Sequence, residues 1–118
     1  MEILLSSLFH AITQTHVFHL QTTSYAEHKA LNKFYDALPD LLDALAESYQ
    51  GKYGIIEYKN IASIAQWKNT DDTIAYLQKI LKIVDAKGSS LQDEYLKNQV
   101  QEIQQLFHST LYKLKYLK

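Results

Sequence analysis

The sequence contains no cysteine and no arginine, and only three glycines and one proline among its 118 residues. Without cysteine the chain can form neither a disulfide, nor a thiolate nucleophile, nor a cysteine zinc site. Without arginine it lacks the planar guanidinium group that favours bidentate contacts with phosphate and guanine, which argues against nucleotide or DNA recognition. The scarcity of glycine and proline argues against the repeated turns of an all-β domain.

The sequence also lacks a large net charge and a long apolar run. It contains twelve lysines and thirteen acidic residues, which give a net charge of −1. No overall electrostatic field therefore attracts the chain to nucleic acid or to an anionic membrane. No apolar run reaches the length of a membrane span. The apolar start at Met1–His10 has no basic region before it and follows helical spacing, which predicts a first helix of the fold and not a signal peptide. With 47% hydrophobic residues, residues 1–118 are expected to form a single domain. The absence of cysteine leaves the cellular compartment open.

Apolar residues recur at helical spacing over four stretches, which predicts an all-α fold. The first helix is expected from about Glu2 to Gln21. The second opens at Ser24, where Ser24 and Glu27 form a capping-box pattern, and it continues past Pro39 with a kink just before that residue. The third begins near residues 69–72 and ends at 86–88, and Ser89 or Ser90 is expected to cap the fourth.

The segment from Gly51 to about Asn69 loses the helical rhythm and has room for one short helical turn around Ile61–Trp67. Two long helices, a crossover of about this length and two further helices predict a ferritin-like four-helix bundle with the crossover between helices two and three.

The most informative candidate site combines imidazole and carboxylate groups, the ligand types that bind iron, manganese or zinc. Its residues are His16, His19, His28, Asp43 and Glu47. The first two histidines are three residues apart and the two acids four apart, so each pair projects from one face of its helix. The alternative is that the histidines are hydrogen-bonded structural residues and the acids an ordinary solvated face. The sequence supports no acyl- or phosphoryl-transfer motif.

The first half of the chain, from about Leu5 to Gly54, resembles the Dps proteins, or mini-ferritins, and small Dps-like proteins of tailed phages. The stretches that carry this resemblance are Thr15-His16-Val17-Phe18-His19-Leu20, Ser24-Tyr25-Ala26-Glu27-His28 and Asp43-Ala44-Leu45-Ala46-Glu47. The second half agrees with these families only in its helical pattern.

The resemblance implies a homo-oligomer that binds iron between subunits and oxidises Fe(II) with peroxide or oxygen. His28 matches the second histidine of the family, and Asp43 and Glu47 match its carboxylate pair, which a neighbouring subunit provides. His19 has the family's local context and His16 its spacing, so either one matches the first histidine. Asn32 stands where the family places an acid, which weakens the expected site.

One alternative hypothesis follows from these residues. The chain could be a non-enzymatic assembly or binding protein, encoded by a phage and acting in the host cytoplasm, that keeps the bundle with a degenerate metal site. DNA binding through a lysine-rich tail is not expected, since no lysine precedes Lys29. The basic cluster at Lys113, Lys115 and Lys118 suits the negative end of a helix dipole.

Overall fold

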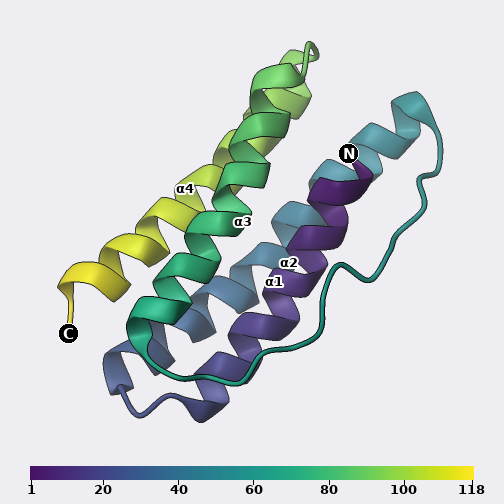
Figure 1. The fold of residues 1–118 in the computed structure, drawn as a ribbon. Helices are drawn as coiled ribbons and strands as arrows, with labels where there is room; N and C mark the ends of the chain where they lie inside the picture. The colour runs from purple at the N-terminus through teal and green to yellow at the C-terminus, as the bar shows by residue number, and fades with distance from the viewer.

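A computed structural model describes all residues, 1–118, as four helices without strands. The helices are α1 (Glu2–Gln21), α2 (Tyr25–Tyr53), α3 (Thr70–Ser90) and α4 (Glu94–Tyr116). As Figure 1 shows, α1 and α2 form one antiparallel pair, α3 and α4 form another, and a long connection runs back along the bundle between α2 and α3. The expected four-helix bundle with a long crossover is therefore confirmed.

Each helix packs against two others, in the order α1, α2, α4, α3 around the bundle. The core between them is a single cluster of buried apolar side chains contributed by all four helices. Near its middle, Phe34 of α2 meets Phe107 of α4 edge to face, with ring centroids 5.0 Å apart. Helix α2 continues through Pro39 without a break, because the apolar stripe on both sides of the proline is buried in this core.

The crossover, residues 54–69, contains no helical turn, so the prediction of a short helical turn around Ile61–Trp67 is wrong. Side chains of α1 satisfy its backbone instead. The Gln14 amide donates to the carbonyl of Ala65 at 2.9 Å and accepts from the Ala65 N–H at 2.7 Å. The hydroxyl of Ser6 likewise accepts from the N–H of Lys59. Because these bonds replace those of a helical turn, the segment lies along α1. The polar residues of α1 that are buried include Ser6 and Gln14.

Two further helix ends differ from expectation. Helix α3 includes both Ser89 and Ser90, and α4 begins after Asp93, so neither serine caps the fourth helix. The carboxylate of Asp93 makes no capping bond to its own helix. It accepts hydrogen bonds from Lys52 and Tyr53 at the C-terminal end of α2. These bonds connect the α3–α4 turn to the end of α2.

The start of α2 confirms one half of the predicted capping box and corrects the other. The Ser24 hydroxyl accepts from the Glu27 N–H at 3.2 Å, as expected for an N-cap. The Glu27 carboxylate does not return to the Ser24 N–H, which donates to the hydroxyl of Thr22. It is buried, only 1% exposed, and bonds to other segments of the bundle instead.

Candidate functional site

His19 and His28 form a reciprocal pair at the end of the bundle where α1 passes into α2. The connection between the helices is only three residues long, so the last turn of α1 faces the first turn of α2. His19 Nδ1 lies 2.7 Å from the carbonyl oxygen of His28, and His28 Nδ1 lies 2.8 Å from the carbonyl oxygen of His19. The two rings stack with centroids 3.7 Å apart and planes 16° from parallel. The pair therefore connects the end of α1 to the start of α2 through two hydrogen bonds.

These bonds define the hydrogen positions on both rings. A carbonyl oxygen only accepts, so Nδ1 of each histidine carries a hydrogen, and in the neutral imidazole Nε2 keeps its lone pair. Metal-ligating histidines commonly have this arrangement, with the other ring nitrogen donating to a carbonyl. However, a nitrogen lone pair lies in the plane of its ring, and the planes here are nearly parallel. The lone pairs of His19 and His28 therefore do not converge on one ion while the rings remain stacked.

His16 is the exposed member of the cluster. Its ring stacks on that of Tyr35, with centroids 4.2 Å apart and planes 17° from parallel. It meets the His19 ring at a steep angle of 60°, with centroids 6.0 Å apart. No hydrogen bond engages either of its ring nitrogens, so both remain available to a ligand. The structure thus brings all three predicted histidines together on one flank of the α1–α2 pair.

Asp43 and Glu47 lie elsewhere on the chain, exposed on the outer face of α2. Fifteen residues separate Asp43 from His28 along one helix, a distance of about 22 Å. Within a single chain no three histidine or acidic side chains are close enough to hold a metal ion together. Asn32, in the position where an acid was expected, donates from its amide to the Asp36 carboxylate at 2.6 Å. The predicted ligands could therefore share one ion only across two subunits.

The residue that sequence reasoning misread is Glu27. Its Oε1 accepts hydrogen bonds from the hydroxyls of Thr22 and Thr70, at 3.1 and 2.6 Å. Its Oε2 accepts from Trp67 Nε1 at 2.9 Å and from the Thr73 hydroxyl at 2.8 Å. The carboxylate also lies beside the N-terminal turn of α3, whose helix dipole favours a negative charge. It joins the α1–α2 turn, the end of the crossover and the start of α3 next to His28.

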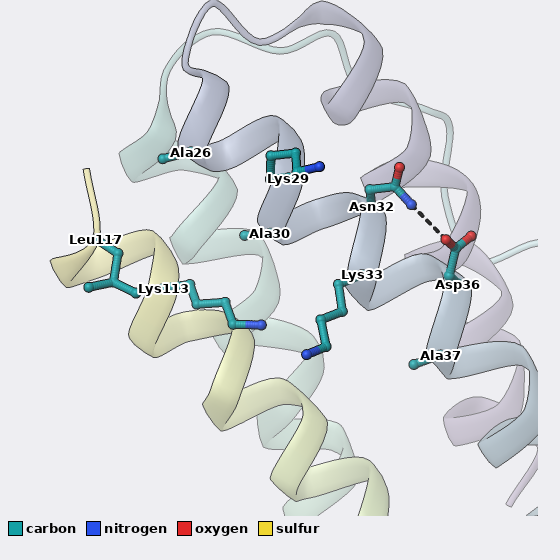
Figure 2. A pocket seen from close by; sticks show the side chains of 9 residues that line it. All are labelled: Ala26, Lys29, Ala30, Asn32, Lys33, Asp36, Ala37, Lys113 and Leu117. Carbon is teal, nitrogen blue, oxygen red and sulfur yellow. Dashed lines mark hydrogen bonds between the residues drawn. The ribbon is translucent and has the colours of Figure 1, made fainter.

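Figure 2 shows an open groove between the first half of α2 and the end of α4. Its volume is about 790 Å³, and small side chains, among them Ala30 and Ala37, lie along it. Lys33 from α2 and Lys113 from α4 extend toward one another across it. Burial, followed by the nearby Lys33 ammonium group, lowers the pKa of Lys113. Three lysines and one acid, Asp36, line the groove, and no carboxylate forms an ion pair with Lys33 or Lys113, so positive charge is in excess there.

The fold defines a small four-helix-bundle protein with a long crossover between its second and third helices. The chain belongs to the DUF5856 family, described as a family of unknown function, whose model matches residues 19–114. Residues of this chain are also 38% identical over 66 positions to an uncharacterized 14.6 kDa protein of Enterobacteria phage T4, from the mobD-ri intergenic region. That match covers 56% of this chain and 50% of the phage protein. No solved structure matches the chain.

The match to a phage T4 protein supports the predicted similarity to small proteins of tailed phages. The descriptions name no ligand, metal or activity, so the Dps likeness and the iron site stay predictions. The chain spans about half the length of the curated phage relative that it matches. None of the four helices is long and apolar enough to cross a membrane.

Proposed function

We propose that this protein is a homo-oligomeric assembly or binding protein that uses the ferritin-like bundle as a scaffold, without redox chemistry. The observation that carries the proposal is the reciprocal His19–His28 pair. Both rings are hydrogen-bonded to the backbone and stacked, so their geometry serves to join α1 to α2. Asp43 and Glu47, which the metal hypothesis assigns to a neighbouring subunit, form no metal-binding group with these histidines within the chain. The phage T4 relative supports a phage origin and action in the cytoplasm of the host cell.

A second candidate function is iron oxidation between subunits. It is favoured by the free Nε2 atoms of His19 and His28 and by the exposed imidazole of His16. Asp43 and Glu47 of a second subunit would complete a set of nitrogen and oxygen donors suited to iron. Fe(II) would then be the substrate, each ion losing one electron to dioxygen or peroxide. In this reading the His19–His28 stack must open, because the two rings cannot share an ion while their planes are parallel.

Metal content separates the two candidates. The untagged protein is loaded with Fe(II) without oxygen, and bound iron per chain is measured, followed by the ferric absorbance on adding peroxide. Asp43→Ala and His28→Ala test the expected ligands, and His108→Ala, which removes an exposed histidine of α4, is the matched control. The assembly proposal expects an oligomer by light scattering, with no more iron bound to the parent and to His108→Ala than to Asp43→Ala and His28→Ala. Stoichiometric iron that oxidises quickly and is lost only in the Asp43 and His28 variants would overturn it in favour of the second candidate.

A further inference from the structure

The exposed face of α2 carries opposite charges in its two halves. Lys29 and Lys33 lie in the first half, and Asp43 and Glu47 lie in the second half. Asp36 and Asp40 lie between them, at the middle of the helix. All six side chains are exposed and fall within an arc of about 80° around the helix, at about 100° per residue. None of the six forms an ion pair within the chain, so no opposite charge of the same chain neutralises this face.

The spacing of these charges is symmetric about Leu38. Lys29 and Glu47 lie nine residues on either side of it, and Lys33 and Asp43 lie five residues on either side. We infer that a second copy of this chain binds this face with its α2 antiparallel, so that Lys29 meets the partner's Glu47 and Lys33 meets the partner's Asp43. A two-fold axis that crosses the charged face at the level of Leu38 along the helix repeats both pairs. The isologous interface then contains four ion pairs. This inference deepens the proposed function, on whose homo-oligomer it rests.

The groove beside α2 fits this partner. Its small side chains, Ala30 and Ala37, allow another helix to approach closely, and its rim carries the ammonium groups. Lys113 of α4 adds a third positive charge beside Lys33, as Figure 2 shows, without an acid of its own chain to balance it. The acidic half of a partner's α2 provides the missing negative charge. Charge complementarity therefore selects a second copy placed antiparallel, since a parallel copy would bring like charges together.

The same register places like charges at its centre. Asp36 and Asp40 lie two residues on either side of Leu38. In the dimer Asp36 therefore faces the partner's Asp40, and Asp40 faces the partner's Asp36. The Asn32 amide already donates to Asp36 and offsets part of this repulsion. Asp40→Asn is therefore expected to tighten the dimer. Because the four flanking ion pairs are exposed, the dimer is also expected to weaken as salt concentration rises.

Charge reversal with restoration tests the register. Sedimentation velocity over a range of concentrations measures the dimer dissociation constant of the parent, Lys33→Glu, Asp43→Lys and the Lys33→Glu/Asp43→Lys double variant. Each single reversal places two like-charged pairs in the dimer and is expected to raise the dissociation constant about tenfold or more. The double variant restores both pairs and is expected to return to within about threefold of the parent. Lys79→Glu, on the exposed side of α3, is the matched control and is expected to leave the dimer unchanged.

The outcomes distinguish this inference from the function on which it rests. A dimer that tolerates both single reversals, or is not restored in the double variant, overturns the α2 register but leaves the proposed homo-oligomer standing. A parent chain that stays monomeric at every concentration overturns both. Circular dichroism of each variant verifies that a lost dimer does not reflect a lost fold.

Discussion

Replacement of Glu27 by glutamine is expected to destabilise the fold by about 2 to 3 kcal/mol. Glutamine keeps the shape of the side chain, but its single oxygen can serve only one of the two pairs of donors that the carboxylate now satisfies. Because an indole N–H only donates, the glutamine oxygen is expected to face Trp67 and Thr73, and its NH₂ group then faces the hydroxyls of Thr22 and Thr70. These two hydroxyls must turn to accept, so each loses the acceptor that its own O–H now has.

The magnitude follows from these partners. A buried donor left without an acceptor costs about 1 to 3 kcal/mol, and the remaining bonds lose the strength that the charge gives them. The smaller desolvation cost of a neutral amide offsets part of this loss. Glu27→Ala removes the acceptor for all four donors and leaves a cavity, so it is expected to cost more, about 4 kcal/mol. A domain of this size has a total stability of about 5 to 15 kcal/mol, so either change is easily measured.

Urea unfolding is the suitable assay, because Trp67 is the single tryptophan of the chain and bonds directly to Glu27. Its fluorescence reports the local environment, and far-ultraviolet circular dichroism reports the helices. Glu102→Gln, on the exposed side of α4, makes the same chemical change without buried partners and is expected to be neutral. A Glu27→Gln variant within about 0.5 kcal/mol of the parent would refute the reasoning, since it would mean that the desolvation cost of the carboxylate cancels its bonds.

Three further predictions concern helix ends and the crossover. Gly51→Ala is expected to raise the melting temperature, corresponding to about 0.5 to 1 kcal/mol, because a Cβ there meets open space inside α2, whereas Gly54→Ala is expected to lower it because φ is 98°. The hydrogen bond from Lys52 lowers the pKa of Asp93 below its ordinary value of 3.8, so its contribution is present above that value and is lost as the pH falls through the folded-state pKa. Asp93→Asn is therefore expected to lose less stability than the parent between pH values of about 5 and 2, and an unchanged acid limb in thermal melts would contradict this. Gln14→Ala is expected to cost about 1 to 3 kcal/mol and to speed amide exchange in the crossover, and exchange rates equal to those of the parent would contradict this.

Local patterns were enough to predict the four helices. The apolar stripes repeat with the helical period, and Ser24 shows the expected N-cap, because periodicity and capping depend on residues only a few positions apart. The long crossover was predicted as well, since the rhythm fades where it begins. The internal structure of that segment was not, because its backbone bonds to Gln14 about fifty residues away.

The chemistry of the candidate site depended on contacts between distant segments. Sequence spacing could bring His16, His19 and His28 to one flank, yet only the short turn between α1 and α2 decided that His19 and His28 would stack and bond to each other's backbone. The positions of these residues therefore followed from the sequence, while the orientation of their rings followed from the packing of two helices.

The sequence by itself determined an all-α bundle with a crossover, a balanced charge and a flank rich in histidine, because these depend on composition and on helical period. The tertiary structure alone decided which polar groups meet. It buried Glu27 among four donors from three other segments, and it placed Lys113 of α4 beside Lys33 of α2. Apart from Thr22, which is five positions from Glu27, these pairings join residues some forty to eighty positions apart. No local pattern records them, because they exist only when the helices pack.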